Sequence, residues 1–315
     1  MKAFVTDAQG VAWDLPPAQS WEMEHGIGTP CDSFVLRCPW QMGLGTKRES
    51  WSGFYAEHKG TRVFTGVVDE CEMIMDGRGC RLELSGRGMA ALLLDNEALG
   101  QDYQLATLKD MLRDHVVPYG IEVKHIPDLP RVARFRVDTG SSEWTALEEF
   151  LRECGGPIPR FDGWGRMILE DSEDSGCLKI DSATPLTRLC YRDKRYGVLS
   201  EILVRDRYSG AVRTVMNDDF STLGGRARRV LTMPGHAAGS EMIRTGEEQL
   251  KRSRAEQAEL EVTLTVPFAA MPGQLVAMER SGFDHNGRYR VAKSATGADE
   301  TGYWTRLTLR PEEYM

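Results

Sequence analysis

The sequence predicts a mainly β protein with an α+β insertion, in which two antiparallel β regions flank a mixed α+β middle domain. Three observations predict this class. Apolar residues alternate with polar ones toward both ends of the chain, as they do in half-buried strands. In the middle of the chain the apolar residues recur with the period of helices. The length of 315 residues is more than one core usually holds, which favours two or three domains.

The first predicted domain covers residues 1–95 and consists of strands joined by tight turns. Alternation predicts strands at 33–37, 54–58, 62–68, 70–75 and 80–85. Turn signals separate them at Lys59-Gly60 and at 76–79. Cys80 shares the alternating face of Leu82 and Leu84, so we expect it to be a small buried hydrophobe. This region is expected to form an antiparallel barrel or a strongly curled sheet.

The middle domain, predicted at residues 96–182, combines helices with short strands. Thr107 can cap a helix with one apolar face, and Pro118-Tyr119-Gly120 ends that helix. Ser141 or Ser142 opens a second helix, which Gly155-Gly156-Pro157 closes. The segment 161–166 then predicts a tight turn between two short strands.

The third predicted domain, residues 183–315, carries an inserted loop and helix at about 217–256. Strands are expected at 198–204 and 212–216, followed by a long loop over 217–239. A polar, weakly amphipathic helix is expected from Ser240 to about Arg254. The chain closes with a meander of alternating runs at 260–266, 288–292 and 303–309, with a sharp turn at Met271-Pro272-Gly273.

The composition excludes several classes of protein. The 39 basic and 47 acidic residues give a net charge of -8, which argues against a general nucleic-acid binder. No apolar run reaches the length of a bilayer span, and the N-terminus lacks a signal-peptide core, so the chain is expected to stay on the cytoplasmic side unless other machinery exports it. The seven cysteines are odd in number and contain no CxxC pair, so neither a disulfide framework nor a zinc site is predicted.

The residues that could carry catalysis are few. The adjacent acids Asp69-Glu70 and Glu148-Glu149 invite a glycosidase-like dyad, but neighbouring side chains point apart in strands and helices, so solvated charge is favoured. His115 lies on the apolar face of its helix and is expected to be a satisfied histidine at the edge of the core. No catalytic or cofactor-binding residue is predicted.

Two charged segments leave alternatives open. Residues 171–176 place oxygen ligands at alternate positions before a glycine, as a calcium loop does, but Ser182 stands where a bidentate Glu should be. A solvated hairpin loop is favoured there over a weak cation site. The basic run 226–229 could contact phosphates, but a salt-bridge role within or between subunits is favoured.

Short motifs in a fixed order over nearly the whole chain carry a family resemblance. They lie at 63–69, 82–88, 92–95, 139–144, 162–165, 193–201, 271–276 and 287–291. In these motifs the chain resembles the hub proteins of contractile phage baseplates, above all the Mu-type and PBSX-prophage-type tail hubs that are like late control protein D. Met271 departs from the pattern, because an aromatic residue is common there. The motif positions, expected to be structural, are Gly66, Gly86, Arg87, Trp144, Gly163, Gly165, Pro272 and Gly273.

The resemblance implies a structural role without enzymatic activity, cofactor or metal. Hub proteins of this kind form a homotrimeric ring with two tube-like β-barrels per chain, so that six similar units join a sixfold tail tube to a threefold spike. The implied partners are further copies of the chain, the central spike protein, the tail tube or tube-initiator protein and the baseplate wedge proteins, without a membrane or a sequence-specific nucleic acid. The implied location is a virion or tail-like particle, such as a tailocin, assembled in the cytoplasm of the bacterial host.

Two other functions stay open from the sequence. A tail-associated peptidoglycan hydrolase is the main alternative, because tail tips often carry such enzymes; it predicts a cleft with convergent carboxylates, with Glu148 and Glu149 as candidates. A carbohydrate-binding β module is less favoured, because the seven tryptophans form no obvious exposed platform.

Overall fold

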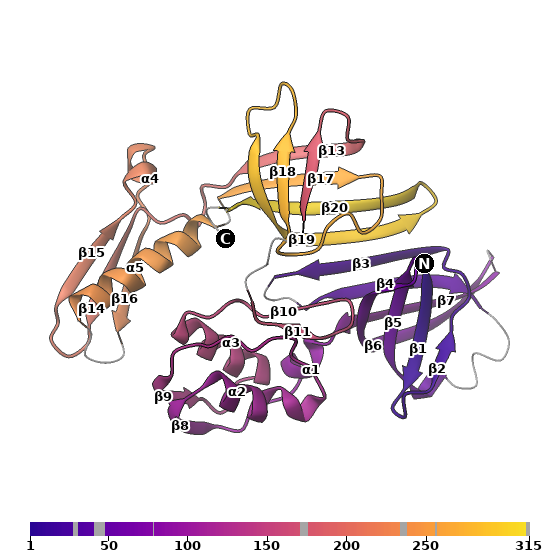
Figure 1. The fold of residues 1–315 in the computed structure, drawn as a ribbon, viewed down its shortest axis with the longest axis horizontal. Coiled ribbons are helices and arrows are strands. Elements are labelled where there is room, and N and C mark those ends of the chain that lie inside the picture. The colour runs from indigo at the N-terminus through magenta and orange to yellow at the C-terminus, as the bar shows by residue number, and fades with distance from the viewer. Residues whose placement is uncertain are drawn as a thin grey trace. The chain divides into compact units, whose positions relative to one another are not determined.

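The computed structural model describes residues 1–27, 31–40, 48–77, 79–170, 176–233, 238–255 and 257–312 (Figure 1). The chain divides into two compact units. Unit 1 consists of Met1–Ser175, Leu264–Gly273 and Lys293–Arg306, and unit 2 of Gly176–Thr263, Gln274–Ala292 and Leu307–Met315. Strands β19 (Gly287–Asp299) and β20 (Gly302–Pro311) contribute residues to both units. The domain boundaries expected near residues 95 and 182 stay a prediction.

The first sheet of unit 1 is antiparallel, with the strand order β3-β4-β7-β6-β5-β1-β2. The second half of β19 pairs with the outer side of β3. The strands are β1 (Lys2–Asp7), β2 (Ala12–Asp14), β3 (Ser20–Gly26), β4 (Ser33–Pro39), β5 (Trp51–His58), β6 (Thr61–Asp76) and β7 (Gly79–Gly88), with a 3-10 turn, η2, at Arg48–Ser50. The strands predicted at 33–37, 54–58 and 80–85 are confirmed, whereas those predicted at 62–68 and 70–75 are two parts of the single strand β6. No strand was predicted at β1, β2 or β3.

Three phenylalanines, one each on β4, β5 and β6, form the centre of this sheet's core. The ring centroids of Phe34 and Phe54 lie 3.8 Å apart in a stacked pair, and Phe64 meets Phe34 edge-on at 5.4 Å. Leu82 and Leu84 of β7 are fully buried beside them. The expectation that Cys80 is buried with these leucines is wrong, because the core ends before the tip of the hairpin and leaves Cys80 half-exposed.

The rest of unit 1 is a helical layer with two short hairpins. Its elements are α1 (Ala91–Leu94), β8 (Gln101–Ala106), α2 (Leu108–His115), η3 (Val117–Tyr119), β9 (Val132–Val137), α3 (Glu143–Cys154), β10 (Arg160–Phe161) and β11 (Met167–Ile168). The helix starts are as predicted. Thr107 and Asp110 form a capping box at α2, and Ser142 caps α3 by accepting a hydrogen bond from the Thr145 amide at 3.1 Å. Gly155 ends α3 in the left-handed conformation.

Unit 2 contains the closing meander and two further strands. Its strands are ordered β13-β17-β20-β19-β18-β12, with β12 parallel to β18. Besides β19 and β20 they are β12 (Cys177–Asp181), β13 (Leu186–Asp193), β17 (Ala258–Leu264) and β18 (Leu275–Glu279). The alternating residues Leu260, Val262, Leu307 and Leu309 are buried as predicted. The mainly β class with an α+β part is therefore confirmed.

A small α+β module, residues 198–255, lies between β13 and β17 in the chain. Its parts are β14 (Glu201–Asp206), β15 (Val212–Met216), α4 (Asp218–Thr222), β16 (Arg228–Met233) and α5 (Gly239–Arg254). The sheet order is β15-β14-β16, and α5 packs on β14 and β15 (Figure 1). Gly246 permits this packing, because a Cβ there would lie 2.5 Å from Val215 Cγ2.

The expectation of a long loop over 217–239 is wrong, because α4 and β16 lie within it. β16 pairs in parallel with β14 along its whole length. Only Leu231 and Met233 of β16 are half-buried, and the other side chains are exposed. The strand is held mainly by its backbone, so its sequence shows no clear alternation.

Candidate functional site

Gly66, Gly86 and Arg87 surround a bulge in β6. The register shifts between Val68 and Glu70, which leaves Asp69 as the extra residue opposite β7. A Cβ on Gly66 would lie 2.0 Å from the Arg87 carbonyl oxygen, and one on Gly86 would lie 2.0 Å from the Val67 carbonyl oxygen. The two strands therefore approach too closely for any residue with a side chain at these positions.

Arg87 ties the bulge to the helical layer. Its guanidinium donates to both carboxylate oxygens of Asp69, at 2.7 and 2.8 Å, and to both of Asp95, at 2.8 and 2.7 Å. Asp95 is the C-terminal cap residue of α1. The hydrogen bonds from Arg87 hold the pKa of Asp95 below its usual value. A planar, five-donor group can serve two carboxylates in this way, which a lysine cannot.

The substitution Arg87→Lys is expected to lower the free energy of unfolding by about 1 to 2 kcal/mol, because it keeps the charge and loses the paired hydrogen bonds. Since the pKa of Asp95 is lowered in the folded state, its contribution is complete above the unfolded-state value of about 4 and is lost as the pH falls below it. The difference in the free energy of unfolding between wild type and variant, measured by urea titration, should therefore become smaller between about pH 5 and pH 2. A difference that stays constant over this range would contradict the role given to Asp95.

The second pair of motif glycines places the β10–β11 hairpin on β6. A Cβ on Gly163 would lie 2.5 Å from the Arg62 carbonyl oxygen, and the Thr65 hydroxyl donates to the Gly163 carbonyl oxygen at 2.8 Å. Gly165 has a φ of +76°, and a Cβ there would lie 2.6 Å from Met89 Cγ. Asp162 holds the turn by accepting from the amides of residues 164 and 166. These glycines thus join the helical layer to the first sheet.

A cation–π arrangement lies at the same contact between the β10–β11 hairpin and the first sheet. The Arg62 guanidinium carbon lies 3.8 Å from the centroid of Tyr55 and 4.7 Å from that of Trp164. An arginine between two rings contributes packing as well as charge. Five of the eight motif residues, Gly66, Gly86, Arg87, Gly163 and Gly165, therefore serve contacts within unit 1.

Of the other three motif residues, one packs in a core and two form a turn. Trp144 is buried in the core of the helical layer, with its ring 6.4 Å from that of Phe161. Pro272 and Gly273 form the turn before β18, where Gly273 has a φ of +89°. A proline followed by a glycine with positive φ is the usual chemistry of a sharp turn. The eight motif positions thus contain no pair of groups poised for proton transfer.

A buried polar network, which the sequence did not predict, joins α2 to α3. His115 Nδ1 lies 2.5 Å from Glu143 Oε2, and the Tyr119 hydroxyl donates to Glu143 Oε1 at 2.9 Å. His115 Nε2 lies 3.0 Å from the Tyr103 hydroxyl, which donates its proton to Asp114 Oδ2. The tautomer of His115 decides which of its ring nitrogens donates in these contacts. Burial raises the pKa of Tyr103, and its hydrogen bond to Asp114 raises it further.

This network suits a structural role. His115 and Glu143 are both buried, and both ring nitrogens of His115 are engaged. An imidazole in that state has no free nitrogen with which to act on a substrate. The expectation that His115 is a satisfied histidine is confirmed, although it lies in the core and not at its edge. Glu143 was missed, because nothing in the spacing connects position 143 with position 115.

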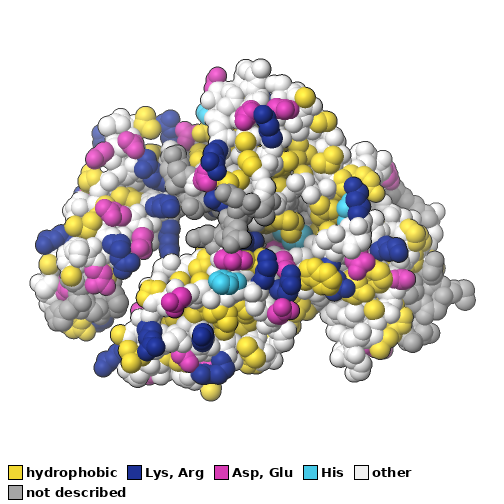
Figure 2. All heavy atoms as spheres, in the orientation of Figure 1, with side chains coloured by type: hydrophobic (Ala, Val, Ile, Leu, Met, Phe, Trp, Pro, Cys, Tyr) yellow, Lys and Arg dark blue, Asp and Glu magenta, His cyan; other side chains and the backbone are white. Residues whose placement is uncertain are grey.

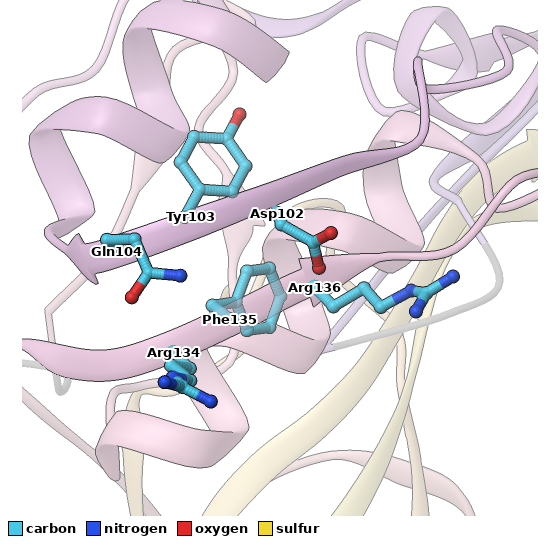
Figure 3. A pocket seen from close by; sticks show the side chains of 6 residues that line it. All are labelled: Asp102, Tyr103, Gln104, Arg134, Phe135 and Arg136. Carbon is cyan, nitrogen blue, oxygen red and sulfur yellow. The ribbon is translucent and has the colours of Figure 1, made fainter.

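A shallow hollow of about 290 Å³ lies on the β8–β9 hairpin (Figure 3). Asp102 lies opposite Arg136 and Gln104 opposite Arg134 on the exposed face of these strands. Tyr103 and Phe135, also on its lining, are buried residues of the core. The hollow presents one carboxylate, whereas the hydrolase alternative requires two that converge.

The structure places the adjacent acids and the basic run, which the sequence offered as candidate site residues, in separate ion pairs. Glu149 is half-buried and lies 3.5 Å from Arg152, and Asp69 is engaged by Arg87, so neither adjacent pair forms a dyad. Arg228 of the basic run binds Glu201 at 2.5 Å, which confirms a salt bridge within the chain for that residue. Residues 171–175 of the acidic loop lie outside the described residues. Among those that are described, no three His, Cys, Asp or Glu side chains are grouped to hold a metal ion.

Within the described part of the chain, no helix combines the length and the hydropathy that a bilayer span requires. No family model matches the sequence, and no curated protein matches it significantly.

Several solved structures do share its fold. The 43 kDa tail protein of prophage MuSo2 from Shewanella oneidensis matches with a TM-score of 0.82 and 15% identity, over 100% of this chain and 99% of that one. The tail protein from Neisseria meningitidis MC58 matches with a TM-score of 0.76 and 16% identity, over 98% and 96%. The Escherichia coli c3393 protein, a type VI secretion component with structural similarity to the T4 tail proteins gp27 and gp5, matches with a TM-score of 0.56 and 15% identity, over 94% and 74%. The chain therefore has the fold of phage tail proteins, as the motif resemblance predicts.

Proposed function

We propose that the chain is a structural hub of a contractile phage tail or a tail-like injection system, where it forms a trimeric ring that joins the tail tube to the central spike. The observation that carries this proposal is the likeness to the MuSo2 tail protein over 100% of this chain and 99% of that one. Because the likeness extends over the whole of this chain, it supports a role in a tail for both of its units.

The use of the motif residues supports a structural role. Gly66, Gly86 and Arg87 hold the bulge and α1, while Gly163 and Gly165 hold the β10–β11 hairpin on β6. These positions keep the parts of unit 1 together and offer no catalytic group. We accordingly propose no enzymatic activity, no cofactor and no metal for this protein.

The presence of two β units in one chain supports a ring that changes symmetry. Three chains supply six β units, so one face of the ring can match a sixfold tube while the other keeps the threefold symmetry of a spike. The proposed partners are two further copies of the chain, the spike, the tube or tube-initiator protein and the wedge proteins. Assembly would take place in the cytoplasm of the bacterial host. The domain division at about 95 and 182 belongs to the same proposal.

The mass of the assembly in solution tests the trimer. We expect native mass spectrometry of the purified chain, with its tube and spike partners present, to give complexes that contain three copies of the 35.3 kDa chain. The fraction of chains in the three-copy complex should rise with protein concentration, because ring formation is a mass-action equilibrium. Complexes with one or two copies at every concentration, with all partners present, would overturn the proposal.

A further inference from the structure

The loop between β18 and β19, residues 280–286, is closed by one side chain (Figure 1). The Arg280 amide donates to Asn286 Oδ1 at 2.8 Å, and Asn286 Nδ2 donates to the Arg280 carbonyl oxygen at 2.7 Å. A backbone N–H can only donate and a backbone carbonyl can only accept, so these partners fix which end of the side-chain amide is the oxygen. The amide of Asn286 therefore joins the two ends of the loop.

The same loop holds a neighbouring turn of unit 2. The Arg280 guanidinium donates to the carbonyl oxygens of Asp181 and Thr184, at 2.6 and 3.2 Å, in the turn after β12. Charged side chains of both signs gather at this end of the unit in the space-filling view (Figure 2). Asn286 and Gly287 are both exposed, so water reaches the closure of the loop.

The sequence singles out Asn286 among the asparagines. The chain has three, at positions 96, 217 and 286, and only the last is followed by a glycine. In an Asn-Gly pair the backbone nitrogen of glycine can approach the side-chain carbon of the asparagine, because glycine has no Cβ in the way. Asn96 is exposed but precedes Glu97, and Asn217 is buried. Both access to water and freedom of approach are therefore combined at position 286.

The hydrogen bond from the Arg280 amide makes the Asn286 side chain a better electrophile. Attack on Cγ moves negative charge to Oδ1, and a donor fixed 2.8 Å from that oxygen stabilises the charge, as the donors of an oxyanion hole do. At Asn96 the hydrogen bond runs from Nδ2 to the Leu92 carbonyl oxygen, which stabilises no charge on Oδ1.

The nucleophile in such an attack is the backbone nitrogen of Gly287. Met278 and Gly287 are the last paired residues of the β18–β19 ladder on the side of the loop. The terminal pair of a hairpin opens more easily than the pairs inside the sheet, and opening frees this nitrogen. The electrophile and the nucleophile therefore lie on adjacent residues at a frayed end of the sheet.

We propose that Asn286 is a self-modification site, at which the chain deamidates by reaction with water and without an enzyme. The Gly287 nitrogen forms a bond to Asn286 Cγ and gives up its proton. The bond from Cγ to Nδ2 breaks, and that nitrogen takes up a proton and leaves as ammonia. Water then opens the cyclic imide at either carbonyl carbon, which leaves aspartate or isoaspartate at position 286. The inference does not depend on the proposed ring function.

Either product opens the closure of the loop. A carboxylate oxygen in the place of Nδ2 cannot donate, and it repels the Arg280 carbonyl oxygen that Nδ2 now binds. Isoaspartate also lengthens the backbone by one methylene, directly before the last residue pair of the ladder. We expect the loop, and with it the contacts of Arg280 to the turn after β12, to loosen as the protein ages.

Peptide mapping by mass spectrometry tests the reaction. The folded full chain, incubated in mildly alkaline buffer, is expected to gain one mass unit at position 286 and to release ammonia, while Asn96 and Asn217 stay intact. A parallel sample unfolded in urea gives the rate without the fold. Modification at position 286 in the unfolded sample alone would overturn the inference, as would equal rates at positions 286 and 96 in the folded chain.

Two variants test the nucleophile and the consequence. Gly287→Ala is expected to slow the reaction at least tenfold, because its Cβ hinders the approach. The φ of +156° at Gly287 strains an alanine, so circular dichroism verifies that this variant folds. Asn286→Asp imitates one product and should speed hydrogen exchange of the amides of residues 280–286, whereas Asn96→Asp should not. A reaction as fast in Gly287→Ala as in wild type would exclude the proposed nucleophile, and unchanged exchange in Asn286→Asp would refute the loosening.

Discussion

Replacing Gly86 with alanine is expected to lower the free energy of unfolding by about 3 kcal/mol or more. The new Cβ would lie 2.0 Å from the Val67 carbonyl oxygen and 2.6 Å from the Phe34 ring. Neither neighbour can move freely, because one belongs to the paired backbone of β6 and the other is stacked on Phe54. The strands must therefore separate at the bulge, and the aromatic core must shift with them.

Calorimetric unfolding of the full chain measures this effect. Gly26→Ala is the matched control, because a Cβ at Gly26 has no atom within 4 Å. Gly66→Ala should resemble Gly86→Ala, since its Cβ meets the Arg87 carbonyl oxygen at 2.0 Å. If Gly86→Ala unfolded at the same temperature as the control, the close approach of β6 and β7 would not be the reason for glycine at this position.

Removal of Glu143 is the second change with a large expected effect. In Glu143→Ala, the buried imidazole of His115 and the half-buried Tyr119 both lose their interaction with the carboxylate of residue 143. Breaking a buried, hydrogen-bonded ionisable pair by removing one partner typically costs about 3 to 5 kcal/mol, because the remaining polar groups have no water to replace it. The helical layer should then unfold at lower urea concentration.

Glu148→Ala is the matched control for this change, because it removes an acid from the same helix outside the network. Its expected effect on the free energy of unfolding is within about 0.5 kcal/mol. In proton NMR, the ring signals of His115 in the buried network should disappear in Glu143→Ala and stay in Glu148→Ala. Equal urea midpoints for the two variants would show that the network does not stabilise the layer.

The parts of the fold that the sequence predicts are those that local chemistry determines. Thr107 and Ser142 begin their helices because each supplies the cap that unpaired amides require. Gly155 ends α3 because it accepts the left-handed conformation. Such signals lie within a few residues of the feature they determine, and the alternating runs of the closing strands are of the same kind.

The parts that the sequence does not predict depend on distant partners. β16 is a strand because β14 supplies its backbone hydrogen bonds, while its exposed arginines give no alternation. The network of His115 and Glu143 joins residues 28 positions apart, so no spacing rule could connect them. The position of Asp69 in a bulge likewise depends on the register with β7.

The candidate site illustrates the same limit. Gly66, Gly86 and Arg87 were predicted to be structural positions from the family resemblance. The resemblance does not explain why these residue types are needed there. The fold supplies a reason for each: Gly66 and Gly86 lie at two close backbone approaches, and the guanidinium of Arg87 is shared by two carboxylates. Residues selected by resemblance are thus explained by contacts that only the folded chain brings together.

Imaging of the purified assembly by electron microscopy tests the central claim most directly. We expect a closed ring with three copies of the chain around one axis, with six β units lining it and the tube on one side. A ring with another number of copies, or density in which the chain lies outside the tube and spike axis, would contradict it.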